Sequence, residues 1–167
     1  MTIQQFLGNK RYKKCQNVKI NFQHYSDNEL LYYDNRPVQE RFTTPVYNYY
    51  SRVIKSTVRG RLKINYWKKS NGAHTSLMKY ISCNSEGKII KYYSYMNLPV
   101  NYKYAALKHY YTKSVEEYCN KSIRGEAFYP NIIFNEKRKK QKMEMYFKIN
   151  KKTDEKIKLF KKLFSLN

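Results

Sequence analysis

The sequence predicts a mixed α/β fold with a β-rich middle and C-terminal helices, and three observations lead to this expectation. Val18, Ile20 and Phe22 alternate with polar residues, which is the two-residue period of a strand. Ser114 and Glu117 have the spacing of a capping box, which begins a helix. The length of 167 residues supports one core, and a hydrophobic fraction of 41% with only 5 Gly and 4 Pro excludes a disordered or collagen-like chain.

The first third of the chain contains one short helix and one strand. Thr2 and Gln5 are placed as a capping box, so a helix begins after Thr2 and ends near Gly8. The alternating pattern predicts a half-buried strand after a basic link. Turn-forming residues then bracket a long loop or short hairpin. The strand, first turn, loop and second turn cover residues 18–23, 24–28, 30–33 and 34–37.

The remaining elements are strands in the middle and helices at the end. Strand-like runs cover residues 53–58 and 62–66, and residues 84–87 form a turn between two further apolar runs. The helix that Ser114 begins ends at Gly125, where glycine is favoured. A final helix carries an apolar stripe of Ile157, Phe160, Leu163 and Phe164. We therefore divide the chain into residues 1–134 and a basic helical extension over residues 135–167.

Charge and cysteine content restrict the partners and the compartment. Thirty-four Lys and Arg against 12 Asp and Glu give a net charge of +22, which favours phosphate-bearing partners or reflects a compositional bias toward lysine. The 3 Cys are widely spaced without a CxxC pair, which is typical of a reducing, cytoplasmic setting. No apolar run approaches the roughly 20 residues of a membrane span. We expect a soluble chain, or one peripheral to the inner face of the membrane.

His109 and Lys113 lie directly before the helix that Ser114 begins. The free backbone amides of a helix N-terminus favour anions, so an imidazole and an ammonium at this place indicate a phosphate or metal-phosphate site. A neutral imidazole can bind a divalent cation, while a lysine provides a point charge for a diphosphate. The alternative interpretation is a packed histidine beside a helix cap.

Four segments, which span most of the chain, carry a resemblance to a known family: residues 18–28, 32–42, 109–118 with 124–125, and 147–156. The most specific reads His-Tyr-Tyr-Thr-Lys-Ser-Val-Glu-Glu-Tyr over residues 109–118, with Arg-Gly at residues 124–125. Together the segments resemble the C-terminal half of a bacterial GT-A glycosyltransferase of the family-two and family-ninety-two groups. The resemblance implies a partial GT-A-like domain whose acceptor-side part is residues 1–134.

The resemblance also implies an activity and a set of ligands. The activity is transfer of a sugar from a nucleotide-sugar donor to a glycan or lipid-linked acceptor, in surface polysaccharide or glycoconjugate synthesis. A divalent metal, Mn²⁺ or Mg²⁺, would hold the donor diphosphate, with His109 as a metal ligand and Lys113 beside the diphosphate. The chain departs from the family at Gln23 and Ser26, where the family has Trp and Gly.

The donor-binding half of the family is a further departure. No DxD motif occurs in this sequence, although the family places one in a nucleotide-binding half that precedes the resembling region. We therefore expect a truncated enzyme that is inactive alone. A separate chain that provides the donor-binding half is the partner that this expectation implies.

The resemblance also implies further candidate residues, because an inverting transferase needs a carboxylate base in its acceptor-side loops. Asp27 is the candidate for the base that takes the acceptor proton, ahead of Asp34 and Glu40, and each of these is also a candidate turn or ion-pair residue. Basic residues that could face a diphosphate, or be placed by chance, are Arg41, Lys55 and Arg59. His24 and His74 are interpreted as surface or loop residues.

Two further functions remain as alternatives. In a nucleic-acid-binding module, basic side chains would contact phosphate and tyrosines would stack on bases, but the sequence lacks a recognisable RNA- or DNA-binding motif. Nucleic acid is thus not the favoured partner. In a peripheral membrane element, the apolar stripe of the final helix would face lipid, unless that stripe packs on its own domain.

Overall fold

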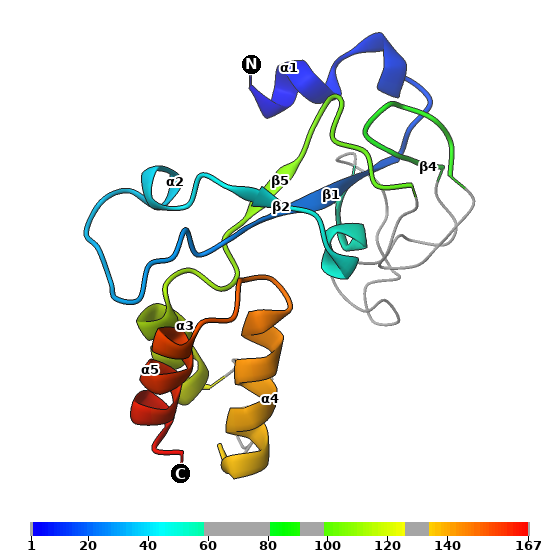
Figure 1. Cartoon of the computed structure of the whole chain (residues 1–167). Coiled ribbons are helices and arrows are strands. Elements are labelled where there is room, and N and C mark those ends of the chain that lie inside the picture. Colours follow the sequence, from blue (N-terminus) through cyan, green and yellow to red (C-terminus); the bar gives the residue numbers. More distant parts are fainter. Residues whose placement is uncertain (1, 59–80, 91–98, 126–133, 167) are drawn as a thin grey trace. The chain divides into compact units, whose positions relative to one another are not determined.

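The computed structural model describes residues 2–58, 81–90, 99–125 and 134–166, and the chain divides into two compact units (Figure 1). The sheet unit comprises Met1–Gln23 and Tyr49–Lys108. The helical unit comprises His24–Asn48 and His109–Asn167. The fold is mixed α/β with C-terminal helices, as the sequence predicts.

The sheet unit is built around the first part of β1, which covers Asn17–Tyr25. This part pairs antiparallel with β3, with Val18 opposite Thr57, and parallel with the short β4. Besides β1, the described residues of this unit form α1 (Ile3–Leu7), the 3-10 turns η1 (Lys10–Tyr12) and η2 (Tyr49–Arg52), and the strands β3 (Ile54–Val58) and β4 (Ser82–Cys83).

The helical unit contains the end of β1 and the longer helices. His24 at the end of β1 lies opposite Val46 of β2 in an antiparallel pair. β5 also pairs with β1 and ends at His109. The described elements of this unit are α2 (Val38–Arg41), β2 (Pro45–Val46), α3 (Val115–Arg124), α4 (Glu136–Phe147) and α5 (Asp154–Phe164). β5 (Leu107–His109) begins in the sheet unit, and only its last residue, His109, belongs to the helical unit.

Three local predictions are confirmed. Thr2 with Gln5, and Ser114 with Glu117, each form a complete capping box in which side chains and backbone N–H groups bond reciprocally. Gly125 ends α3 with φ of 89°, a conformation in which only glycine avoids steric cost. The local pattern of caps and glycine is therefore sufficient to set both ends of α3.

Strand β1 corrects the expectation of a half-buried strand, because eight of its nine residues are buried. Lys19 and Asn21 point to the face that the alternating pattern assigned to solvent, yet each is 1% exposed. Asn21 donates from Nδ2 to the backbone oxygens of Ser51 and Arg52, at 3.3 and 3.2 Å. A buried amide needs such partners. Both faces of the strand are therefore covered by other parts of the chain, and these polar side chains lie inside the unit.

The buried Lys19 makes stability depend on pH. Burial lowers the pKa of Lys19 from 10.5 to about 8. Between these two values the unfolded chain binds more protons than the folded chain, so the free energy of unfolding should rise with pH. Relative to Lys19→Met, the wild type should gain on the order of 2 kcal/mol between pH 8 and 10.5. Urea unfolding across this range measures the difference, and parallel curves for the two proteins would contradict it.

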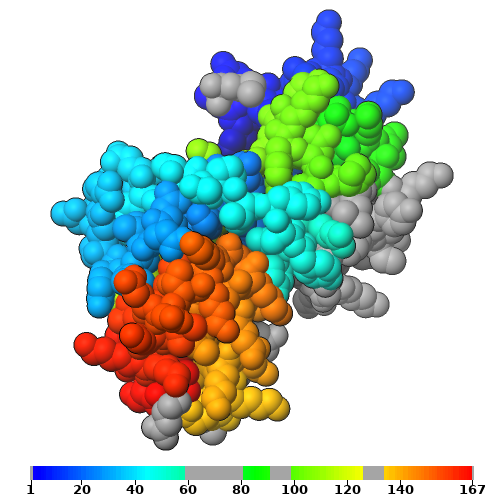
Figure 2. Space-filling view, in the orientation of Figure 1, coloured from blue at the N-terminus to red at the C-terminus, as the bar shows by residue number. Residues whose placement is uncertain are grey.

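The helices α3, α4 and α5 pack around one aromatic core. This core includes residues of the final helix and lies on both sides of the predicted boundary at 134/135. Tyr118 of α3, Tyr146 of α4 and Phe160 of α5 are at most 2% exposed, and their rings lie 5.0 to 6.3 Å apart. Figure 2 shows the atoms of α5 (red) directly against those of α4 (orange). Residues on both sides of the 134/135 boundary therefore contribute to one core.

The apolar stripe of the final helix faces this core. Phe160 and Phe164 are 0% and 2% exposed, and Leu163 packs against the same cluster. The stripe thus packs on its own unit, which was the alternative to a lipid-facing helix. No helix in the described segments combines the length and the hydrophobicity needed to cross a bilayer.

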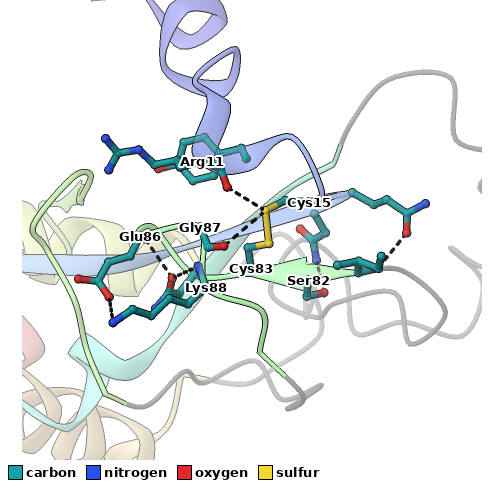
Figure 3. Close-up of a disulfide and its surroundings, with 12 residues drawn as sticks. Arg11, Cys15, Ser82, Cys83, Glu86, Gly87 and Lys88 are labelled. Atoms are coloured by element: carbon teal, nitrogen blue, oxygen red, sulfur yellow. Dashed lines mark hydrogen bonds and ion pairs between the residues drawn. A yellow bond between two sulfur atoms is a disulfide. The ribbon is translucent and has the colours of Figure 1, made fainter.

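A disulfide joins Cys15 to Cys83 in the sheet unit (Figure 3) and corrects the expectation that the cysteines remain thiols. The sequence separation of 68 residues hides this pairing from spacing arguments. The turn predicted at residues 84–87 brings it about. Gly87 has φ of 80°, and a Cβ there would lie 2.5 Å from the backbone oxygen of Arg11. Glycine therefore permits the close approach that places the two cysteines together.

The disulfide also bears on the compartment. Disulfides persist in oxidising environments and are rare in the cytosol, so the state of this cysteine pair in the cell depends on the compartment, and the predicted reducing setting would keep both thiols free. Cys119 is a free, buried thiol, and burial raises its pKa to about 12. The predicted strand at residues 62–66, together with Arg59 and His74, lies outside the described residues.

Candidate functional site

The segment from His109 to Ser114 connects β5 to α3 and contains a strained residue. Lys113 has φ of 55°, the left-handed region that costs a non-glycine residue on the order of 1 kcal/mol. Such strain often lies at functional sites. The ammonium of Lys113 lies 3.4 Å from Glu117, and its side chain is 42% exposed. Lys113 is therefore partly accessible in a defined backbone conformation.

A network of buried polar side chains contacts the backbone of this segment at Lys113. The hydroxyl of Tyr146 lies 2.6 Å from Oδ2 of Asp27 and 3.3 Å from the backbone oxygen of Lys113. The ammonium of Lys156 lies 2.7 Å from the same carboxylate and 2.8 Å from Glu29. Burial, followed by the carboxylate of Asp27, raises the pKa of Tyr146, so this hydroxyl stays protonated and continues to donate.

These contacts define the role of Asp27, which the sequence left open between a base and a turn or ion-pair residue. It is 2% exposed, its Oδ1 accepts from the backbone N–H of Glu29 at 3.0 Å, and its Oδ2 is paired with Lys156. A general base must reach the proton that it takes. A carboxylate enclosed in this way lacks that access, so we no longer assign Asp27 as the base. It is the ion-pair partner of Lys156.

The N-terminus of α3 also differs from expectation, because its amides are not free. The N–H groups of Val115 and Glu116 donate to the backbone oxygens of Leu30 and Leu31, at 3.3 and 3.0 Å. Glu117 and Ser114 satisfy each other in the capping box. The first-turn donors that a phosphate would use are thus occupied by the chain itself. Any anion site here must use side chains.

Arg41 is occupied as well, which corrects its assignment as a diphosphate contact. Its guanidinium donates to both oxygens of Glu117, at 2.7 and 3.3 Å, and the residue is 6% exposed. Burial raises the pKa of Glu117, but Arg41, Ser114 and Lys113 outweigh it, so the pKa lies below its usual value. Arg41 thus holds the first turn of α3 in place. Its guanidinium is therefore not available to a ligand.

An open pocket of about 640 Å³ follows α3 within the helical unit. Its charged side chains are three cations and two carboxylates. One carboxylate, Glu117, is paired with Arg41, and the other, Glu116, accepts the backbone N–H of Tyr33 at 2.7 Å. The rest of the lining consists of cationic, polar and aromatic side chains. The lining residues are Tyr33, Tyr110, Tyr111, Thr112, Lys113, Glu116, Glu117, Asn120, Lys121 and Arg124.

His109 belongs to an aromatic group rather than a metal cluster. Its ring lies 4.9 Å from that of His24, edge on, and 5.7 Å from Tyr111, stacked. His24 is 3% exposed, so the expectation of a surface or loop residue is wrong for it. In the described segments no three His, Cys, Asp or Glu residues gather where they could hold a metal ion. The residues present therefore do not fit a Mn²⁺ or Mg²⁺ centre by themselves.

Lys55 and Asp34 are not among the residues that line this pocket. Lys55 is opposite Ile20 on β3 of the sheet unit, whereas Lys113 and His109 are in the helical unit. Asp34 bonds to Arg36 at 2.6 Å, which lowers the pKa of its carboxyl to about 2. Asp34 is thus a carboxylate in a local ion pair, the alternative that the sequence left open.

Sequence reasoning missed several pocket residues. Lys121 and Arg124 are three residues apart and share one face of α3. This spacing could have identified them in the sequence as neighbouring cations. Tyr33 and Thr112 come from loops whose path depends on tertiary contacts, so no spacing argument identifies them.

Comparisons with protein-family models, curated proteins and solved structures return no match for this chain.

Proposed function

We propose that this chain is the acceptor-side part of a GT-A-like glycosyltransferase, which acts on a nucleotide-sugar donor and a glycan or lipid-linked acceptor. One observation carries the proposal. The segment that most resembles the family, residues 109–118 with 124–125, includes the end of β5, the strained Lys113 and both ends of the capped helix α3, and it borders the pocket. A motif that only filled the core would not need this combination of strain, cations and accessibility.

The residues of this chain suit binding and orientation better than proton transfer. Lys113 would place its ammonium beside the donor diphosphate and stabilise the negative charge that develops on the leaving group. Tyr146 and the Asp27–Lys156 pair would hold the backbone of that loop.

A second chain is part of the proposal. The sequence has no DxD motif, and the described residues form no metal cluster, so a donor-binding half would supply the carboxylates for Mn²⁺ or Mg²⁺. A cytoplasmic location of this chain would require Cys15 and Cys83 to remain reduced in the cell, so the state of these two thiols tests that location.

An add-back experiment tests the activity. Extracts from producing cells with this gene deleted would be supplied with Mn²⁺ and radiolabelled uridine-diphosphate sugars, and label in glycan or lipid products would be measured. The purified wild-type chain should restore transfer from one of the sugars. Lys113→Gln should lower the restored rate by about tenfold or more, because it removes one charge contact to the leaving group.

The matched control is Lys158→Gln, an exposed lysine on α5 that should restore transfer fully. Far-ultraviolet circular dichroism and urea unfolding would establish that both variants fold. Restoration of no transfer by the wild type, with any sugar of the panel, would sink the proposed function. Full restoration by Lys113→Gln would remove Lys113 from the donor contact.

A further inference from the structure

The pocket along α3 contains a buried polar group whose hydrogen bond is missing. Thr112 lines the pocket and is 1% exposed, and its hydroxyl has no hydrogen-bond partner among the described residues. A buried hydroxyl without a partner costs free energy, and a bound ligand or water is the usual explanation. The position of Thr112 in the lining thus points to a polar ligand.

Two cations lie on the same helical face of α3, away from its N-terminus. Lys121 and Arg124 line the pocket and are exposed. The ammonium of Lys121 lies 4.4 Å from the ring centre of Tyr111, which favours one position for the charge. Residues three apart are neighbours on a helix, so the two cations can bind one anionic group.

The rest of the lining suits a sugar. Tyr33 is 61% exposed and lies at the pocket, so its ring offers an apolar surface. Asn120 provides an amide with both donors and acceptors on the face of α3. From Glu117 to Arg124 the helix rises about 10 Å, which is enough for a single monosaccharide with a charged substituent.

We propose that this pocket binds an anionic sugar unit of the acceptor, which carries a phosphate or a carboxylate. This inference rests on the proposed function, since it names the acceptor class of the same site. Thr112 and Asn120 bond to sugar hydroxyls, Tyr33 covers an apolar face of the ring, and Lys121 and Arg124 bind the anionic group. Of the two carboxylates of the pocket, Glu117 is neutralised by Arg41 and Lys113. Glu116 accepts the backbone N–H of Tyr33 and keeps its negative charge, which the cations Lys121 and Arg124 outnumber.

Isothermal titration of the full-length chain at fixed ionic strength tests the inference without any donor. The probes are glucose 6-phosphate, glucuronate, glucose and inorganic phosphate. At least one of the two anionic sugars should bind about tenfold or more tighter than both glucose and inorganic phosphate, and the preferred one distinguishes phosphate from carboxylate. Equal affinity for that sugar and inorganic phosphate, or for that sugar and glucose, would overturn the inference.

Variants assign the contacts. Arg124→Gln and Lys121→Gln should each weaken binding of the preferred anionic sugar by about tenfold, since a hydrogen bond to a charged group is lost. Thr112→Val should weaken it severalfold without lowering stability, because the change removes an unpartnered buried hydroxyl. Lys158→Gln is the control with the same charge change and should leave binding unchanged. Unchanged binding in all three pocket variants would overturn the inference.

The two proposals fail separately. If the wild-type chain restores sugar transfer but binds no anionic sugar, the acceptor inference falls and the proposed function stands. If no transfer is restored while the anionic sugar binds through Thr112, Lys121 and Arg124, the pocket stands as a binding site and the transferase assignment falls.

Discussion

Lys156→Met should lower the free energy of unfolding of the helical unit by about 3–5 kcal/mol. Lys156 and Asp27 are 1% and 2% exposed and form an ion pair of 2.7 Å. The substitution leaves the buried carboxylate without its cation, and the cost of an uncompensated buried charge exceeds the cost of losing an exposed pair. Urea unfolding, followed by circular dichroism of the helices, measures the change.

Two further variants separate the effect of the buried ion pair from the general effect of removing a lysine from α5. The control, Lys158→Met, removes an exposed lysine from the same helix and should change stability by less than about 0.5 kcal/mol. The double variant Asp27→Asn with Lys156→Met should recover part of the loss, because neither buried charge remains. An undiminished stability of Lys156→Met would contradict the pairing. It would also reopen the assignment of Asp27 as a base.

Loss of the Cys15–Cys83 disulfide should destabilise the sheet unit by about 4 kcal/mol, since the bond closes a long loop in the unfolded chain. The double variant Cys15→Ala with Cys83→Ala tests this by urea unfolding without reductant. Addition of a reductant should destabilise the wild type to a similar extent. The same reductant should leave the double variant unchanged, which makes that variant the control for effects unrelated to the bond.

A thiol count establishes whether the disulfide forms in the cell. Protein from cells lysed in the presence of an alkylating agent and denaturant should carry one label, on Cys119, when no reductant is added. Prior reduction should raise the count to three, the number of cysteines in the chain. Three labels without reduction would mean that the thiols stay reduced, as the cytoplasmic prediction requires.

The helices α1 and α3 and their ends could be predicted from the sequence because their signals are local. The capping box of Ser114 and Glu117 and the glycine at 125 operate within one helix, so their effect survives in any tertiary setting. The apolar stripe around Phe160 likewise identifies a buried helix face. It does not identify the partner, and the same pattern was compatible with lipid until α3 and α4 were seen to cover it.

The candidate site was only partly predictable. The motif from His109 to Lys113 was found, and Lys113 does line a pocket. The pairing of Arg41 with Glu117 was not found, because the two residues are 76 positions apart and nothing in their spacing relates them. The amides of α3 looked available from the sequence, but the loop that contains Leu30 and Leu31 occupies two of them.

By itself the sequence determined what short-range chemistry can set: which segments become helix or strand, where α1 and α3 begin and end, and the large excess of positive charge. Tertiary structure alone decided the burial of Lys19 on a nominally polar face, the enclosure of Asp27 by Lys156, and the bond between Cys15 and Cys83. The physical reason is range. Caps and periodicity act over a few residues, whereas burial and pairing depend on which distant segments the folded chain brings into contact.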